Sequence, residues 1–521
     1  MFKNEYTWGK AVENNAVSEF DEKFDTAFTL VKENLGKEYP IIINGKEIFL
    51  DNKFDVKSPC DTRIIVAKFS QATKEDTIYA IESAKNAFGE WSSVSYKKRA
   101  QIFKDCAKLF SEQMFHLAAI LSLENGKNRI EAMGDMDEAI DFLRFYAYQL
   151  EINEGFEKET PHPNQKERTK TLLKPYGVWG IISPFNFPSA IAIGMTTGAL
   201  ITGNTAILKP ASDTPLSSFK FIEAIYKKLP SGAINFITGP GSVVGKTLME
   251  NSLVDGIAFT GSQEVGMSGF QKFTEKTVKP FISEMGGKNP VIVTEFADLE
   301  KASEGVMRAA FGYGGQKCSA CSRVYVQKNI ADKFIKKLDE KTNSLKIGLP
   351  WKKDVFLGPV INKAAQEKFQ FVIDLAKKDG QILIGGSILQ DGDYEHGYYV
   401  EPTIITKLPR DHKLVKEELF LPILYVDKFE TFDEAIKLAN DTEYGLTAGI
   451  FSENKQELEK FFNEIQAGTV YANRGTSATT AALVQSQPFV GWKNSGNSGR
   501  GAGGEQYLQQ FLRAQTQTRC D

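Results

Sequence analysis

The sequence predicts an α/β protein in which parallel sheets are covered by helices. Short apolar runs such as 178–182 and 256–259 alternate with longer amphipathic stretches such as 217–229. Short runs that are apolar throughout are typical of strands buried on both faces, and the amphipathic stretches are typical of helices that cover them. Because a chain of 521 residues exceeds what one hydrophobic core usually serves, we expect two or three compact units.

Two series of strands are predicted along the chain. The first includes the helix at 217–229, and its strands are expected at 178–182, 206–208, 234–237, 256–259 and 290–293. The second includes a helix-patterned stretch at 331–343, and its strands are expected at 324–326, 399–402 and 423–426. Each series is expected to form its own α/β unit.

The composition favours small molecules as partners. The 63 basic and 66 acidic residues nearly balance, so the protein has no field that would gather nucleic acid or an anionic membrane. Residues 1–16 carry charges and no apolar core, so they resemble neither a signal peptide nor an Arg-rich transit sequence. The most apolar segment, 190–201, is interrupted by Thr196, Thr197 and Gly198 and is shorter than the roughly 20 residues needed to cross a bilayer. We expect no membrane insertion.

Cysteine usage indicates a reducing compartment. The five cysteines are an odd number spread along a long chain, which argues against a disulfide framework. The cytoplasm is the simplest location for such a protein. The four histidines are isolated in the sequence, so no metal site is expected.

One cysteine is a candidate nucleophile. In the stretch 314–323, Cys318 is isolated among small polar residues ahead of the strand-like run 324–326. A partly ionised thiol is the best side-chain nucleophile at neutral pH. Cys321 would make a CxxC pair with it, but zinc requires further thiols or histidines close in sequence, and a thioredoxin-like pair is expected at a helix start in a much smaller fold. We therefore interpret Cys321 as a structural or spectator thiol.

A carboxylate upstream complements this thiol. Glu284 is followed by Gly286 and Gly287, which could let backbone or a ligand approach closely. Apolar neighbours can raise the pKa of such a carboxyl, which suits a general base. Taken alone, Glu284 could also be a solvated charge on a loop. Together, the thiol and the carboxylate suggest covalent catalysis.

The segments around Glu284 and Cys318, with 184–188 and 259–266, resemble the aldehyde dehydrogenase superfamily. The resemblance runs from about residue 40 to the C-terminus, with the motifs in the order and spacing of that family. It implies a Rossmann-type cofactor domain, a second α/β catalytic domain and a small oligomerisation sheet. The expected division is 1–154 and 176–285 for the dinucleotide-binding domain, 286–482 for the catalytic domain, and 155–175 and 483–521 for the oligomerisation segment and substrate anchor loop.

The alternating run 169–173 is typical of an exposed strand. In the resembled family, such a strand and the end of the chain form a small sheet used for oligomer contacts. The resemblance therefore implies a homodimer or a larger homo-oligomer.

The resemblance also implies an NAD(P)-dependent oxidation of an aldehyde to an acid. The thiolate of Cys318 adds to the aldehyde, the adduct loses a hydride to a nicotinamide, and water cleaves the resulting thioester. Asn186, on a loop pinned by Pro184 and Pro188, could stabilise the oxyanion together with the backbone N–H of Cys318. Glu284 would activate the water and could first deprotonate the thiol.

Two glycine-rich turns are candidate cofactor sites. Each follows a predicted strand and opens a helix, where bare N–H groups can face a pyrophosphate. The candidate residues are Gly241 and Gly245 in one turn and Gly261 and Ser262 in the other. The run 245–247 is similar to the end of a P-loop, but Pro240 stands where that motif requires glycine, so a P-loop is rejected.

Further cofactor contacts are implied by the resemblance. In the resembled enzymes, Lys209 reaches the adenosine ribose, and Glu418 with Phe420 holds the nicotinamide side. Leu421 replaces the usual glycine, which could change the geometry of the Glu418 loop. Ser212 stands where NAD-preferring members often carry a glutamate, so NAD is expected and NADP is not excluded.

A narrower resemblance is to the 1-pyrroline-5-carboxylate dehydrogenases, which oxidise glutamate γ-semialdehyde to L-glutamate in proline catabolism. It rests on 315–323, on 471–476, and on 487–489 followed by a glycine-rich loop that ends in Gly503 and Gly504. Val490 and Trp492 depart from the usual glycine-rich pattern of that loop.

The expected substrate carries an ammonium and a carboxylate at its far end. A loop of glycines offers N–H donors without side-chain obstruction, which suits a carboxylate. Ser319, Gly503 and Gly504 are therefore the candidates for the carboxylate, and Phe187 and Phe489 are further candidate substrate contacts. The alternative is that the loop is only a flexible turn near the C-terminus.

Dehydrogenases for another semialdehyde, such as that of succinate or 2-oxoglutarate, are the main alternative. Those sites usually grip the distal carboxylate with arginine, which Arg474 or Arg500 could supply. A CoA-acylating dehydrogenase is disfavoured, since such enzymes generally lack a carboxylate at the position of Glu284. A non-catalytic protein on the same fold is disfavoured because the nucleophile, the base, Asn186 and Lys209 are all present.

Overall fold

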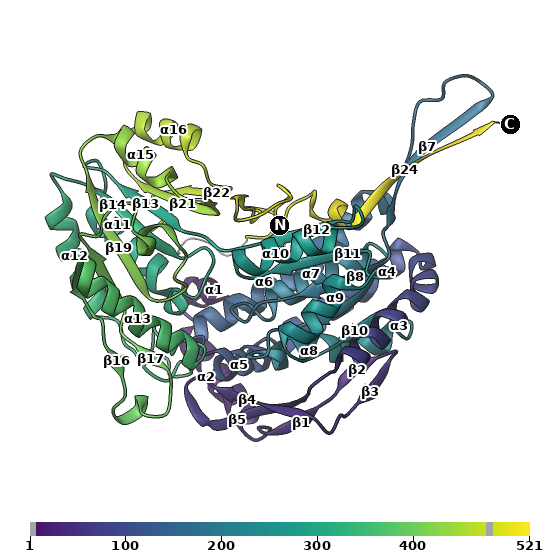
Figure 1. Cartoon of the computed structure of the whole chain (residues 1–521), viewed down its shortest axis with the longest axis horizontal. Helices are drawn as coiled ribbons and strands as arrows, with labels where there is room; N and C mark the ends of the chain where they lie inside the picture. Colours follow the sequence, from purple (N-terminus) through teal and green to yellow (C-terminus); the bar gives the residue numbers. More distant parts are fainter. Residues whose placement is uncertain (1–6, 476–482, 521) are drawn as a thin grey trace.

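The computed structural model describes residues 7–475 and 483–520, and its centre consists of two seven-stranded sheets (Figure 1). The first has the order β12-β11-β8-β9-β10-β2-β3. The five strands from β12 to β10 run parallel, and the hairpin β2–β3 joins them antiparallel. The strands are β2 (Ile41–Ile43), β3 (Lys46–Ile48), β8 (Val178–Ile182), β9 (Thr205–Lys209), β10 (Ile234–Phe236), β11 (Gly256–Thr260) and β12 (Phe281–Glu284).

Four of the five strands predicted for the first unit are confirmed, as β8 to β11. The fifth prediction was wrong in its placement, because 290–293 belongs to the second sheet as β13. Its place is taken by β12, which has only four residues, half of them polar (Ser283 and Glu284). That pattern has no apolar run to mark a buried strand. The chain crosses from one sheet to the other at 285–288.

The second sheet has the order β15-β18-β19-β14-β13-β21-β22. All its pairs are parallel except the edge pair β15–β18. The strands are β13 (Asn289–Val293), β14 (Cys321–Gln327), β15 (Gln381–Ile384), β18 (Thr403–Thr406), β19 (Ile423–Phe429), β21 (Thr447–Phe451) and β22 (Thr469–Ala472). The strand predicted at 399–402 is shorter, because Pro402 has no N–H to donate; β17 (Tyr399–Val400) pairs instead with β16 (Ile388–Leu389).

Helices cover both sheets. Those of the first unit are α3 (Lys74–Ser93), α4 (Tyr96–Glu112), α5 (Met114–Asn125), α6 (Arg129–Ile152), α7 (Ala190–Ile201), α8 (Pro215–Ile225), α9 (Lys246–Glu250) and α10 (Gln263–Thr274). Those of the second are α11 (Leu299–Phe311), α12 (Ala331–Asn343), α13 (Lys363–Asp379), α14 (Lys413–Lys416), α15 (Phe432–Asn440) and α16 (Lys455–Glu464). The long helix α6 packs against α4, α5 and α7, which places it at the centre of the molecule.

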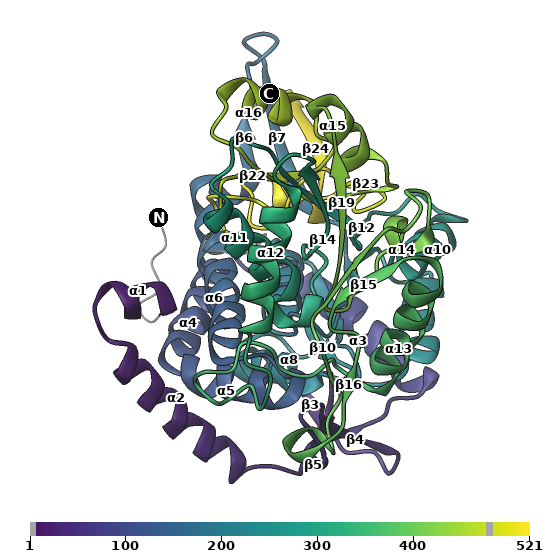
Figure 2. The same cartoon turned by 90° about the vertical axis from the view of Figure 1, so that its left-hand side faces the viewer.

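The chain ends are held by smaller elements. Helices α1 (Trp8–Glu13) and α2 (Val17–Lys32) lie along the outside, with α2 against α5 (Figure 2). A three-stranded sheet is formed by β1 (Lys37–Tyr39), β4 (Lys53–Ser58) and β5 (Asp61–Ser70). A second one, of β6 (Glu157–Glu159), β7 (Glu167–Pro175) and β24 (Leu512–Cys520), extends as an arm from the body (Figure 1). The short strands β20 (Tyr444–Gly445) and β23 (Trp492–Lys493) pair with each other.

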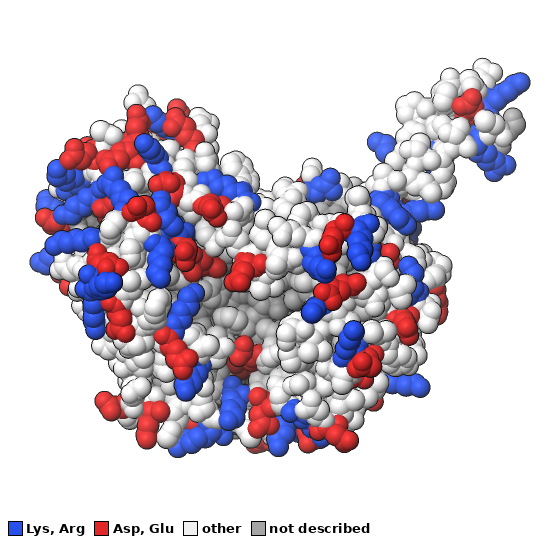
Figure 3. Space-filling view, in the orientation of Figure 1, with Lys and Arg blue, Asp and Glu red and all other residues white. Residues whose placement is uncertain are grey.

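The face of the molecule in Figure 3 carries no large patch of like charge. Acidic and basic side chains are intermixed over the face in Figure 3, as the near-balance of charge predicts. In the described part of the chain, no helix combines the length and the apolar character needed to span a membrane.

Candidate active site

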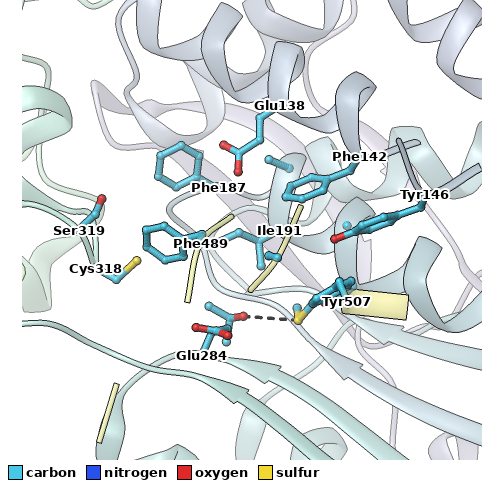
Figure 4. A pocket seen from close by; sticks show the side chains of 15 residues that line it. Glu138, Phe142, Tyr146, Phe187, Ile191, Glu284, Cys318, Ser319, Phe489 and Tyr507 are labelled. Carbon is cyan, nitrogen blue, oxygen red and sulfur yellow. Dashed lines mark hydrogen bonds between the residues drawn. The ribbon is translucent and has the colours of Figure 1, made fainter. Parts of the chain in front are cut away.

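A cavity lies between helices α6 and α7, the ends of β11 and β12, and the loop before β14 (Figure 4). Of the residues named from the sequence, five line it, from four distant segments: Phe187, Glu284, Cys318, Ser319 and Phe489. The rest of its wall is mainly apolar and aromatic. The remaining lining residues are Glu138, Phe142, Tyr146, Ala190, Ile191, Gly194, Met195, Thr260, Ala502 and Tyr507. The fold therefore places a thiol and two carboxylates around one apolar space.

The Cys318 loop is fixed from behind. It follows a turn in which Tyr313, Gly314 and Gly315 all have positive φ, between 51° and 67°. The side chain of Asn289 donates to the carbonyls of Cys318 and Ala320, at 2.7 and 2.9 Å. Burial, and then the nearby carboxylates, raise the pKa of the Cys318 thiol well above its ordinary value. Ionisation of this thiol therefore requires a base or an added positive charge.

Glu284 ends β12 and reaches the cavity from the opposite side to Glu138 in the view of Figure 4. Burial raises the pKa of its carboxyl to about 8. Its Oε2 is buried and has no hydrogen-bond partner in the described residues. A carboxyl with a pKa near neutrality can both accept and release a proton in turnover, which suits a general base.

Asn186 is 2% exposed and lies between β8 and α7. Its Oδ1 accepts a hydrogen bond from the backbone N–H of Phe187 at 3.1 Å, which leaves the side-chain NH₂ to serve another acceptor. Asn186 does not itself line the cavity, although Phe187 does.

Glu138 is the functional candidate that sequence reasoning missed. It projects into the cavity from α6, and Phe142 and Tyr146 follow on the same face at successive turns (Figure 4). Burial and then Asp135 raise the pKa of the Glu138 carboxyl to about 8. The signal in the sequence was a carboxylate in line with two aromatic residues at a spacing of four.

A buried ion pair supports this wall of the cavity. Lys127 Nζ lies 2.8 Å from Asp135 Oδ2, and both side chains are fully buried. The other Asp135 oxygen accepts from the N–H of Ala190, the first residue of α7, at 2.7 Å. Lys127 Nζ also lies 3.6 Å from the centre of the Phe187 ring. The pair therefore joins α6, α7 and Phe187 into one unit behind the cavity.

The predicted anchor loop is only partly directed at the cavity. Ala502 and Phe489 line it, whereas Gly503 and Gly504 do not. The N–H of Gly503 donates to the Tyr146 hydroxyl at 3.1 Å, and that of Gly504 donates to the Gly501 carbonyl at 3.0 Å. These N–H groups are thus engaged within the protein in this structure.

Neither candidate arginine lines the cavity. Arg474 donates to Gln487 Oε1 at 3.0 Å, and the Arg500 carbonyl accepts from Gln510. Of the segment 471–476, Thr476 lies outside the described residues.

The candidate adenosine site forms at the ends of β9 and β10. Lys209 is 5% exposed, burial lowers its pKa to about 8, and its Nζ donates to the Pro210 carbonyl at 2.9 Å. A Cβ added at Gly245 would lie 3.9 Å from the Lys209 side chain, and one at Gly241 would meet open space. The Ser212 hydroxyl is directed to the Gly239 carbonyl, at 3.5 Å. Space beside a buried ammonium fits a ribose and its phosphates.

The second glycine turn is linked to the candidate base. Ser262 caps α10 by accepting from the N–H of Val265 at 3.4 Å. The N–H of Gly261 donates to the Glu284 carbonyl at 3.1 Å. A ligand held at this turn would therefore lie next to the strand that carries Glu284.

The loop of Glu418 lies against the chain that follows Glu284, at the candidate nicotinamide end. Glu418 Oε1 accepts from the N–H of Gly287 at 2.9 Å, and burial raises its pKa to about 7. Lys368 holds the loop by donating to the Leu419 carbonyl at 2.7 Å. Phe420 has a φ of 59°, unfavourable for a non-glycine residue, and its ring meets that of Phe185 edge-on at 5.7 Å.

Leu421 stands in place of the family's glycine, and the fold accommodates its side chain. Its side chain is 4% exposed and packs into the core of the second unit. Its carbonyl instead demands a glycine on the facing loop, because a Cβ at Gly315 would lie 2.2 Å from it.

Comparison with known proteins gives one consistent result. The chain matches the model of the aldehyde dehydrogenase family over residues 49–517. It is 37% identical, over 509 residues, to 1-pyrroline-5-carboxylate dehydrogenase of Oceanobacillus iheyensis, with 96% of this chain and 97% of that protein covered. It is also 37% identical, over 502 residues and 95% of each protein, to 1-pyrroline-5-carboxylate dehydrogenase 2 of Bacillus subtilis.

Solved structures agree. The structure of 1-pyrroline-5-carboxylate dehydrogenase from Thermus with bound NAD matches with a TM-score of 0.93 at 33% identity, over 100% of this chain and 99% of that chain. Betaine aldehyde dehydrogenase from Staphylococcus aureus, in complex with NAD+, matches with a TM-score of 0.88 at 31% identity, over 94% and 95%.

Proposed function

The chain belongs to the aldehyde dehydrogenase family, and we propose that it oxidises L-glutamate γ-semialdehyde, the open form of 1-pyrroline-5-carboxylate, to L-glutamate in proline catabolism. NAD is the hydride acceptor. The relatives that carry this activity in their names match over nearly the whole chain, so the proposal concerns the complete site rather than one domain.

One observation carries the choice of substrate. Within the described residues, the cavity wall contains two carboxylates, Glu138 and Glu284, and neither lysine nor arginine. Glutamate γ-semialdehyde brings an ammonium group, which favours the ionised form of Glu138 against the effect of burial and can then pair with it. All three semialdehydes carry a carboxylate, but only glutamate γ-semialdehyde also carries an ammonium that can offset the repulsion of its carboxylate by an ionised Glu138. Glu138 therefore favours the amino acid semialdehyde over both alternatives.

The residues in and next to the cavity can carry out the steps of the reaction in order. The Cys318 sulfur adds to the aldehyde carbon, and Asn186 and the Cys318 N–H donate to the oxygen that becomes negative. When bound, the nicotinamide would supply the acceptor for the hydride that leaves that carbon. Glu284 then takes a proton from water as the water oxygen attacks the thioester, and the Cys318 thiolate leaves. The apolar wall limits competing hydrolysis by excluding other water.

The cofactor fits the two glycine turns and the residues beside them. Lys209 and Ser212, with Gly241 and Gly245, support the adenosine end, and Gly261 with Ser262 supports the pyrophosphate. Glu418 and Phe420 support the nicotinamide end. On this basis we assign cofactor binding to 1–154 and 176–285, catalysis to 286–482, and assembly and substrate anchoring to 155–175 and 483–521.

The direct test compares initial rates of NAD and NADP reduction with glutamate γ-semialdehyde, succinate semialdehyde and 2-oxoglutarate semialdehyde, with Cys318→Ala as the blank. The proposal expects clear preference for glutamate γ-semialdehyde. Preference for either of the other aldehydes would keep the thiol chemistry and reject the role assigned to Glu138.

The raised pKa of Glu284 makes a prediction about pH. A general base works only when ionised, and burial holds this carboxyl protonated up to about pH 8. We expect the rate of thioester hydrolysis to rise as pH increases through about 8 and then to level off. The hydrolysis phase with p-nitrophenyl acetate, followed between pH 6 and 10, measures this, and a flat profile would contradict it.

Two further properties are proposed. The arm formed by β6, β7 and β24, and the exposed apolar residues Val265, Met267 and Phe270 on α10, support a homodimer or larger homo-oligomer. Light scattering after size-exclusion chromatography tests this, and a particle of 58.0 kDa would be a monomer.

The free cysteines, one of them the proposed nucleophile, support a location in the cytoplasm.

A further inference from the structure

The strand that carries Glu284 is an edge strand with one open side. Among the strands of the described residues, β12 pairs with β11 alone, and it is the first strand in the order of its sheet. Backbone groups of Ile282 and Glu284 face β11, so those of Phe281, Ser283 and Met285 face outward. An edge of this kind leaves its outward groups for another segment to satisfy.

The segment 495–497 occupies that edge. Asn497 donates to the Phe281 carbonyl at 2.6 Å and accepts from the Ser283 N–H at 3.0 Å. The Ser495 carbonyl accepts from the Met285 N–H at 2.8 Å. All three outward positions around Glu284 are therefore held by two residues, and in Figure 1 this yellow segment runs beside β12.

Ser495 also reaches the second unit. Its hydroxyl donates to the Gly286 carbonyl at 2.7 Å and accepts from the Gly445 N–H at 3.0 Å. Gly445 belongs to β20, which pairs with β23 just ahead of Ser495. Ser495 is fully buried, so both of its bonds lie away from water. One side chain thus joins the strand of the base to the unit that carries Cys318.

The Glu284 carboxylate itself has little to hold it. Its Oε2 has no hydrogen-bond partner in the described residues, so its direction follows from its backbone. The same C-terminal segment contributes Phe489 and Ala502 to the cavity. The position of the base is therefore tied to the loop that encloses the substrate.

Resting on the proposed function, we propose that Ser495, assisted by Asn497, is a positioning residue that sets Glu284 against the thioester on Cys318. Its loss displaces the base while the nucleophile, which is held by Asn289, stays in place. Acylation of Cys318 is then preserved and hydrolysis slows. A misplacement of about 1 Å can cost about 100-fold in rate, so we expect about a 10- to 100-fold loss in the hydrolysis step.

The test uses p-nitrophenyl acetate, which needs no cofactor. The acetyl group passes to the Cys318 sulfur with release of p-nitrophenolate, and water then releases acetate. Ser495→Ala should keep the initial burst of p-nitrophenolate and lose about 10- to 100-fold in the steady rate. Hydroxylamine, which attacks a thioester without a general base, should restore turnover. A merely structural defect would lower burst and steady rate together and would not respond to hydroxylamine.

Two variants complete the experiment. Asn497→Ala removes the same support from an exposed position, so it keeps the proposal testable if Ser495→Ala does not fold. Ser498→Ala is the matched control, because its hydroxyl accepts from the nearby Arg500 N–H, at 3.3 Å, and makes no other hydrogen bond within the part of the chain that the structure describes. Equal loss of burst and steady rate in both Ser495→Ala and Asn497→Ala would overturn the positioning role. Absence of aldehyde oxidation by the unaltered protein would instead reject the proposed function.

Discussion

Replacement of Glu284 by glutamine is expected to stop turnover after one oxidation. The amide has nearly the shape of the carboxyl, but it cannot accept a proton from water, so the thioester on Cys318 should accumulate. General bases typically contribute about 100- to 10,000-fold, and we expect the steady rate to fall within that range. Rapid mixing with NAD and aldehyde should still give a burst of reduced cofactor, and mass spectrometry of the quenched protein should find the acyl adduct.

The matched control for this experiment is Glu275→Gln, which removes the same charge from an exposed carboxyl paired with Lys272. It should leave both phases unchanged. If Glu284→Gln lost the burst together with the steady rate, Glu284 would be needed to ionise the thiol as well. An unchanged steady rate would remove Glu284 from the mechanism.

Local sequence patterns predicted the fold where each strand was apolar throughout. The runs at 178–182 and 256–259 correspond to β8 and β11, and the helix predicted at 331–343 has those bounds in the structure. β12 was not predicted, because this edge strand ends in a functional residue and lacks an apolar pattern. The strand at 290–293 was recognised, but its sheet was not, since a short run does not specify which neighbours it will pair with.

The same distinction applies to the site. Cys318 and Glu284 stand in short motifs whose neighbours are close in sequence, and the structure brings both to one cavity. Glu138 has no motif around it, because its role depends on how α6 packs against α7. Until that packing is known, a carboxylate on a long helix is read as part of a solvated face. Ser495 was missed for a related reason, since its partners are contributed by distant segments of both units.

Glu138→Gln is expected to change which aldehyde the enzyme prefers. The variant keeps the size of the side chain and removes the carboxyl that ionises when the substrate's ammonium lies beside it. Hydrogen bonds to charged groups contribute about 1.5 to 3 kcal/mol, so kcat/KM for glutamate γ-semialdehyde should fall roughly 10- to 100-fold. Propanal, which has no ammonium, should be oxidised at nearly the original rate. Succinate semialdehyde should improve above about pH 8, where the unaltered Glu138 is ionised and repels its carboxylate.

Opposite changes in the oxidation rates of glutamate γ-semialdehyde and succinate semialdehyde would distinguish a change in substrate recognition from a general loss of structure. A variant that merely disturbed α6 would lower the rates for all three aldehydes, since the Lys127–Asp135 pair and Phe187 lie on the same wall. Glu151→Gln, on the last turn of α6 and paired with Lys104 away from the cavity, is the matched control and should leave the preference intact. If Glu138→Gln lowered propanal and glutamate γ-semialdehyde oxidation equally, the ammonium would be bound elsewhere, and the argument that the cavity selects an amino acid semialdehyde would fail.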